Sequence, residues 1–80
     1  MEEKLFRYIQ DVVFKVSGKR DIVYETDFVK DLGLNSFDIM NIVSIFEEHF
    51  DADIPSRDVW KMHLVKDVIQ YMIKNGYTDV

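Results

Sequence analysis

One serine stands where a hydroxyl could be chemically modified. Ser36 follows the glycine-containing loop Asp31-Leu32-Gly33-Leu34-Asn35 and begins a segment with helical periodicity. The first N–H groups of a helix have no partner in the helix, and the helix dipole favours an anion beside them. A phosphoryl group carried on Ser36 would therefore be tolerated, and Asp38 could attract a cation or a basic partner. Taken alone, a serine at this place is more often a helix N-cap.

Other groupings of reactive side chains predict no site. His49 and His63 have Asp51 and Asp53 nearby, but their spacing fits no zinc pattern and the chain has no cysteine. The run Asp51-Ala52-Asp53 lacks the glycine and the later ligands of a calcium loop. Ser36 has no identifiable histidine partner for a catalytic triad. We therefore expect no metal site and no catalytic residue, and the size of the chain argues against a self-contained enzyme.

The elements that position Ser36 are predicted to be helices. Apolar residues recur with helical spacing over 2–16, 36–50 and 65–75, and a short helix is expected from Ser56 to about Lys61. Residues 19–35 show no sustained period and predict a long ordered loop. The fold class expected is all-α: a small four-helix bundle with a short third helix and a long loop between helices one and two.

The ends and the buried faces of these helices are also predicted. Gly18 is expected to end the first helix, Asn35 or Ser36 to cap the second, Ser56 to cap the third, and Asn75-Gly76 to close the last. The apolar stripes and the apolar residues that pin the loop are Leu5, Ile9, Val12, Val13, Val16, Ile22, Phe28, Val29, Leu32, Ile39, Ile42, Val43, Phe46, Phe50, Val65, Val68, Ile69 and Met72.

Length and composition limit what the chain can do. Eighty residues, 48% of them apolar, suit a single domain spanning 1–80 with a small core. No apolar run approaches the roughly 20 residues of a membrane span, and no basic-then-apolar leader precedes the first helix. We expect a free-standing cytoplasmic monomer, because the chain begins at Met1 and carries no export signal.

The charge favours protein partners over nucleic acid. The net charge is -5, so the chain repels phosphate backbones. The segment 27–53 is more negative than the whole chain, with a net charge of -6 from one base, Lys30, and seven acids: Asp27, Asp31, Asp38, Glu47, Glu48, Asp51 and Asp53. Partners with basic surfaces would be steered toward the region around Ser36.

Several segments, in order, resemble the acyl carrier protein family. The attachment motif of that family corresponds to Leu32-Gly33-Leu34-Asn35-Ser36-Phe37-Asp38, preceded by Thr26-Asp27-Phe28-Val29-Lys30-Asp31. Downstream, Phe46-Glu47-Glu48-His49-Phe50, Asp53-Ile54-Pro55 and the closing helix from Val65 to Met72 also match. The resemblance covers nearly the whole chain.

This resemblance implies a carrier without catalytic activity. A phosphopantetheinyl transferase would attach 4′-phosphopantetheine from coenzyme A to Ser36, and the thiol of that arm would hold an acyl group as a thioester. Acyl-transfer and synthase enzymes with basic docking surfaces would be the other partners. The second helix would be their contact surface, through Asn35, Phe37, Asp38, Met40, Asn41, Glu47 and Glu48.

The chain departs from the family pattern near Ser36. Asn35 stands where Asp is common, Phe37 where Leu is usual, and Asn41 where fatty-acid carriers usually have Glu, while Ser44 makes the same face less apolar. General fatty-acid synthesis and a polyketide-like or other specialised pathway both remain open. An unmodified helical interaction module that uses the same acidic helix is the alternative function.

Three further expectations concern the core and its edge. The side chains of Met40, Ile42, Phe46, Met62 and Ile69 are expected on facing helices that could part to shelter an acyl chain. Apart from these, Trp60 on the short helix is expected to be a partly buried anchor. The ring of Tyr71 is expected in the core with its hydroxyl at the edge.

Overall fold

The computed structural model describes residues 1–80 and contains four helices and no strand. The helices are α1 (Glu2–Ser17), α2 (Ser36–Phe50), α3 (Ser56–Val59) and α4 (Val65–Lys74). The all-α fold class is therefore confirmed, with a single-turn α3 and a long connection between α1 and α2. None of the four helices is long and apolar enough to cross a membrane.

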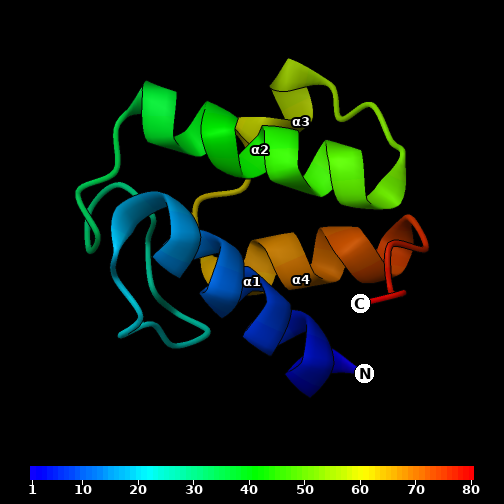
Figure 1. The fold of residues 1–80 in the computed structure, drawn as a ribbon, viewed down its shortest axis with the longest axis horizontal. Helices are drawn as coiled ribbons and strands as arrows, with labels where there is room; N and C mark the ends of the chain where they lie inside the picture. Colours follow the sequence, from blue (N-terminus) through cyan, green and yellow to red (C-terminus); the bar gives the residue numbers. More distant parts are fainter.

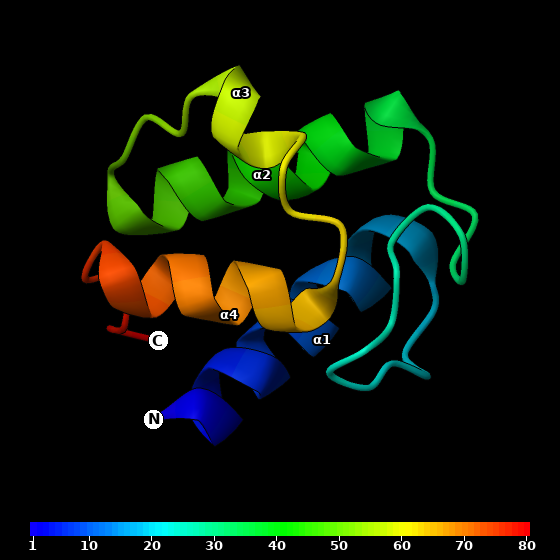
Figure 2. The ribbon, with the colours of Figure 1, turned by 180° about the vertical axis from the view of Figure 1, so that it is seen from behind.

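The helix α1 packs against both of the other long helices. In Figure 1, α2 lies above α4, and α1 lies below α2 and passes in front of α4. Figure 2 shows the opposite side, with α4 and the short α3 in front. Both chain ends lie at one side of the molecule, and α2 begins at the other side, beside the long loop. The molecule measures 28 × 25 × 20 Å along its principal axes.

The sequence of α1 accounts for its length. Glu2 and Glu3 lie in its first turn, where carboxylates stabilise the positive end of the helix dipole. The helix ends at Gly18, which has a φ of 75°, and the Gly18 N–H donates to the Phe14 carbonyl at 2.7 Å. Glycine adopts this left-handed conformation without steric cost, so the predicted end of the helix is confirmed.

The core lies where α1, α2, α4 and the long loop meet. Leu5 and Ile9 on α1 and Val65 on α4 are fully buried, and each such side chain contributes about 1.5–3 kcal/mol through burial. The core cluster consists of Leu5, Ile9, Val12, Val13, Ile22, Phe28, Leu32, Leu34, Phe46, Val65, Ile69 and Met72. Most of the predicted stripes are thus confirmed, but on α2 only Phe46 is fully buried.

The loop of residues 19–35 is fixed to the start of α4. The Phe28 N–H donates to the His63 carbonyl at 3.1 Å, and the Val65 N–H donates to the Thr26 carbonyl at 3.0 Å. The expectation that Val29 pins the loop is wrong, because its side chain is 52% exposed. Thr26 is buried instead, and its hydroxyl accepts the Val23 N–H at 2.8 Å. Because this hydrogen bond satisfies the hydroxyl, the polar side chain of Thr26 can be buried.

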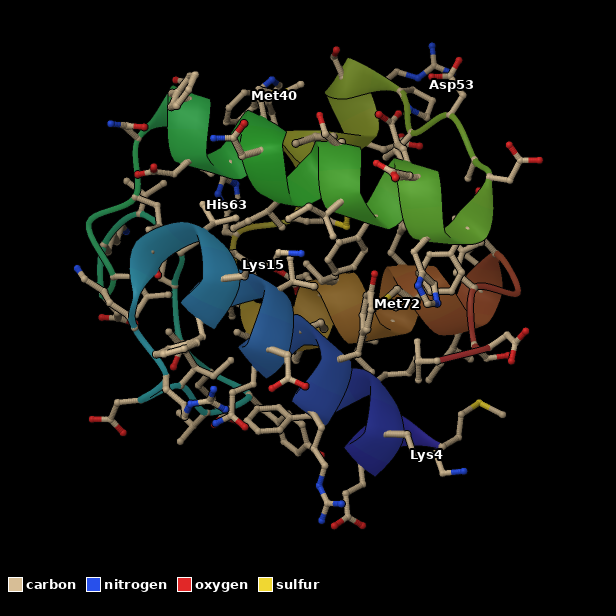
Figure 3. The ribbon with its side chains drawn as sticks, in the orientation of Figure 1. Lys4, Lys15, Met40, Asp53, His63 and Met72 are labelled. Carbon is tan, nitrogen blue, oxygen red and sulfur yellow. The ribbon has the colours of Figure 1, made fainter.

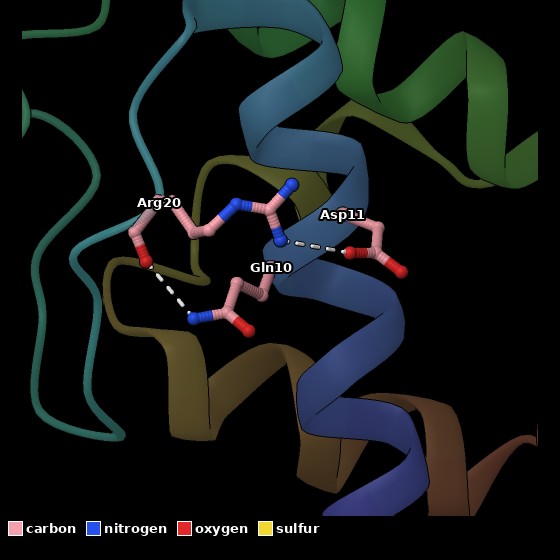
Figure 4. A network of polar contacts seen from close by, with 3 residues as sticks. All are labelled: Gln10, Asp11 and Arg20. Carbon is pink, nitrogen blue, oxygen red and sulfur yellow. Dashed lines mark hydrogen bonds and ion pairs between the residues drawn. The ribbon is translucent and has the colours of Figure 1, made fainter.

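Polar contacts tie the other end of the loop to α1 (Figure 4). The Gln10 side-chain amide donates to the Arg20 carbonyl at 2.9 Å, and the Arg20 guanidinium lies 3.3 Å from the Asp11 carboxylate. The same guanidinium lies 4.2 Å from the centre of the Phe14 ring. The Lys19 ammonium donates to the Leu32 carbonyl. These contacts hold the loop along its length, so Ser36 is reached through an ordered chain.

Two details of α3 differ from expectation. Ser56 does not cap the helix: Pro55 occupies the N-cap position, and no side chain makes a cap hydrogen bond. The helix ends at Val59, earlier than the expected Lys61. Its position is set instead by α4, because the Tyr71 hydroxyl donates to the Asp58 carboxylate at 2.8 Å. Burial, together with this hydrogen bond, raises the pKa of Tyr71 to about 12.

Candidate functional site

Ser36 is the first residue of α2, and its neighbours fix the helix start. The Asn35 side chain accepts the Asp38 N–H at 2.9 Å, and the Asp38 carboxylate accepts the Asn35 N–H at 3.2 Å. This reciprocal capping box, in which Asn35 takes the cap position, resolves the choice between Asn35 and Ser36. The capping hydrogen bonds belong to Asn35 and Asp38, so the side chain of the exposed Ser36 takes no part in the capping box.

The turn before α2 presents Ser36 on a rigid support. Leu32 and Leu34 are both buried, and the exposed Gly33 between them has a φ of 68°. This left-handed conformation lets the chain reverse so that both leucines enter the core. The Gly33 N–H donates to the Val29 carbonyl at 3.0 Å. Ser36 therefore follows an anchored turn and points into solvent at the positive end of α2, where a phosphate ester fits.

Removing the cap of α2 should weaken the protein. Asn35→Ala leaves the Asp38 N–H without its acceptor, so we expect the free energy of unfolding to fall by about 1 kcal/mol in urea titrations. Asn35→Asp retains a capping oxygen and serves as the matched control, with stability close to that of the original chain. Equal stability of all three proteins would contradict the role of this capping box.

The solvent-facing side of α2 carries two exposed apolar side chains close to Ser36. Phe37 is 73% exposed and Met40 is 41% exposed, and Ser44 and Glu48 continue the same side at helical spacing. Phe37 and Met40 thus lie on the outer face beside Ser36, as expected. Asn41 is half-buried. This exposed strip, Phe37, Met40, Ser44 and Glu48, carries one acid.

Several acids of the segment 27–53 close turns in the backbone. Asp27 accepts the N–H groups of Val29 and Lys30, both at 2.9 Å. The Lys30 N–H is the main reason that the pKa of Asp27 lies below its usual value. The Asp31 carboxylate in turn accepts the Asp27 N–H at 2.7 Å. Negative charge here therefore shapes the loop as well as the surface.

Of the two neighbouring glutamates of α2, one accepts a backbone hydrogen bond and the other is exposed. Glu47 is half-buried, and its carboxylate accepts the Ile54 N–H at 2.8 Å, which fixes the turn after the helix. Glu48 is exposed beside α1, in a shallow groove that Tyr8 and Lys15 also line. Glu47 and Glu48 consequently occupy different sides of α2. No group of three or more His, Cys, Asp or Glu side chains is placed to hold a metal ion.

An apolar cavity of about 160 Å³ lies between α2, α4 and the α3 segment. Its lining residues are Ile9, Phe28, Val29, Ile39, Ile42, Val43, Phe46, Ile54, Val59, Trp60, Met62, His63, Val68, Tyr71, Met72 and Tyr77. Figure 3 shows Met72 within the bundle and Met40 on the outer side of α2. Because Ile39 follows Ser36 by about one helical turn, the cavity extends to the end of α2 that carries the serine.

Three of the five residues predicted to surround an acyl chain line this cavity. Ile42, Phe46 and Met62 line the cavity as expected. Met40 does not, because it lies on the exposed strip, and Ile69 is packed into the core at 3% exposure. The aromatic share of the lining was not predicted, because Phe28, Trp60 and Tyr77 come from a loop, the end of α3 and the C-terminal tail.

Two aromatic expectations are also decided by these positions. Trp60 lines the cavity and is 45% exposed, so it is partly buried as expected, although it follows the last residue of α3 rather than lying within the helix. The Tyr71 ring lines the cavity and its hydroxyl reaches Asp58 at the edge, as expected.

Comparison with known proteins agrees with this geometry. The family model described as "Phosphopantetheine attachment site" matches residues 7–72. The chain is 44% identical over 70 residues to an acyl carrier protein of Bdellovibrio bacteriovorus, covering 85% of this chain and 90% of that one. It is 38% identical over 69 residues to an acyl carrier protein of Syntrophobacter fumaroxidans, covering 84% and 85% of the two chains. The corresponding protein of Akkermansia muciniphila is 35% identical over 74 residues, covering 92% and 90%. The chain therefore belongs to the acyl carrier protein family, whose members catalyse no reaction themselves and carry their cargo on 4′-phosphopantetheine.

Proposed function

We propose that Ser36 is the residue to which 4′-phosphopantetheine is attached. The observation that carries this proposal is the free, exposed hydroxyl on the first residue of α2, held by the Asn35–Asp38 capping box. A phosphate ester at this place lies beside the positive end of the helix dipole. The group, once bound, supplies a thiol that holds an acyl chain as a thioester. The chain itself contains no cysteine, so this thiol has no competitor in the protein.

The test is incubation with coenzyme A, magnesium and a broad-specificity phosphopantetheinyl transferase. Intact mass should rise by one phosphopantetheine group, and fragmentation should place the group on Ser36. An unchanged mass, or a group on Ser44 or Ser56, would contradict the proposal.

The cavity supports a role in sheltering short acyl chains. Engineered protein cavities of about 150 Å³ accept a molecule the size of benzene. The cavity here, at about 160 Å³, is similar and therefore suits a chain of roughly six carbons. Short acyl groups occur in fatty-acid synthesis and in polyketide-like or other specialised pathways, so the cavity size bears on the cargo and leaves the pathway open.

Partner enzymes are proposed to meet the exposed strip of α2 beside Ser36. Phe37 and Met40 offer apolar contact area, while Glu48 is the acid of the strip available to a basic surface. Asp38 and Glu47 are less accessible, since both accept backbone N–H groups. The transferase and the acyl-handling enzymes would thus combine an apolar contact with electrostatic steering.

Reversing one exposed charge tests the steering. Glu48→Lys should slow modification by the transferase about twofold to fivefold at low salt, because a basic partner is then repelled. The effect should shrink as salt rises and screens the charges. Asp21→Lys, an exposed acid outside the segment 27–53, is the control for net charge. A rate unchanged by Glu48→Lys at every ionic strength would show that steering plays no part.

A further inference from the structure

One residue of the cavity lining is not hydrophobic. Of the sixteen residues that form the wall, fifteen are hydrophobic and the other is His63. His63 is exposed and lies in the connection between α3 and α4. Figure 3 shows it beneath the first half of α2, on the side opposite to Met40. It thus combines a place in the cavity wall with access to solvent.

The backbone holds His63 from two sides. Its carbonyl accepts the Phe28 N–H at 3.1 Å, and its N–H donates to the Asp67 carboxylate at 3.2 Å. The N–H of the next residue, Leu64, donates to the same carboxylate at 3.0 Å. The imidazole nitrogens take no part in these bonds, so the ring is positioned by the fold while its donor and acceptor remain free.

The electrostatic surroundings of the ring also point to polar contact. Asp27 lies close enough that the charge of His63 contributes to keeping the pKa of that carboxyl low. One oxygen of the Asp27 carboxylate accepts the N–H groups of Val29 and Lys30. The imidazole thus belongs to the wall of an apolar cavity and has free ring nitrogens, so it can donate to an oxygen of a group held in that cavity.

We propose that His63 is a specificity-determining contact for acyl groups that carry an oxygen close to the thioester. This inference rests on the proposed attachment to Ser36. An oxygen taken into the apolar cavity without a partner loses its hydrogen bond to water, whereas His63 supplies a replacement. A saturated chain gains nothing from the ring. The cavity of this protein thus favours short acyl groups with a hydroxyl or keto oxygen at the third carbon over saturated ones of the same length.

The test uses three loaded forms of the full chain. The transferase transfers the arm from coenzyme A, butyryl-coenzyme A or 3-hydroxybutyryl-coenzyme A, and intact mass verifies one group per protein. A failure of attachment would appear here, before any measurement on His63. The imidazole carbon-bound proton signals are then recorded by NMR. We expect the His63 signal to shift in the 3-hydroxybutyryl form relative to the other two. His49, whose ring contacts the Asp79 carbonyl at 2.9 Å, is the internal control.

A second readout measures protection of the cargo. Hydrolysis of each thioester on the protein is divided by its hydrolysis on free coenzyme A. We expect the 3-hydroxybutyryl group to be protected about threefold to tenfold more than the butyryl group, as one net hydrogen bond allows. The difference should persist in His63→Gln and disappear in His63→Phe.

Three outcomes would overturn the proposal. The His63 signal could be the same in all forms, or it could shift equally in the form that carries the arm alone, which would assign the contact to the arm. The extra protection could also survive in His63→Phe. If His63→Phe does not fold, the NMR comparison on the original chain and the Gln variant still decide the matter.

Discussion

Replacing Ser36 with alanine should abolish attachment of phosphopantetheine and leave the stability of the protein almost unchanged. The Ser36 hydroxyl is exposed and lies outside the hydrogen bonds of the capping box, so its loss removes none of those bonds. Alanine is also a good helix former. Intact mass after incubation with the transferase should show no gain, while urea unfolding should give a free energy within about 0.5 kcal/mol of the original.

The matched control for this experiment is Ser44→Ala. Ser44 is an exposed serine on the same helix, two turns further along. Its replacement should leave the mass gain intact, because its hydroxyl is remote from the helix start. A full mass gain on Ser36→Ala would show that another residue accepts the group, and the proposed carrier chemistry would then have to be assigned elsewhere.

Replacing Ile9 with alanine should cost about 2–5 kcal/mol of unfolding free energy. Ile9 is fully buried, belongs to the core and also lines the cavity. A domain of this size has a total stability on the order of 5–10 kcal/mol, so the variant should unfold at much lower urea concentration. Ile73→Ala removes the same atoms from a residue that is 37% exposed on α4, and it should cost far less.

The same substitution tests whether the acyl chain reaches the part of the cavity that Ile9 lines. In protein loaded with a hexanoyl group, the chain would fill part of the space left by Ile9. The loss of stability should then be smaller in the loaded form than in the unmodified form. An equal loss in both forms would mean that the chain stays outside the part of the cavity that Ile9 lines.

The helices were predictable because their signals are local. The limits of α2 follow from the Asn35 cap at one end and from the loss of apolar spacing after Phe50 at the other. Gly18 likewise marks the end of α1, since few other residues adopt its left-handed conformation. The short α3 lacks such a signal: Ser56 is of a type that caps helices, but it is the first helical residue, Pro55 takes the N-cap position, and no side chain caps the helix.

The site was predictable only in part, because exposure depends on packing between distant segments. The sequence predicts Glu47 to be a surface charge, but its carboxylate accepts the Ile54 N–H and fixes the turn after α2. Val29 read as a loop anchor, yet Thr26 is the buried residue, because its hydroxyl has a backbone partner. His63 is the single residue of the cavity wall outside the hydrophobic class, and its sequence context did not indicate this position. Its position follows from hydrogen bonds to Phe28 and Asp67, which only the folded chain brings together.

The placement of the two chain ends has a practical consequence. Both ends lie at the side of the molecule away from the start of α2, as Figures 1 and 2 show. A tag, a fluorescent reporter or a surface tether fused at either end would therefore leave Ser36, the proposed attachment residue, accessible. The domain can accordingly be immobilised or joined through a flexible linker to a second protein while its arm stays free to reach an enzyme.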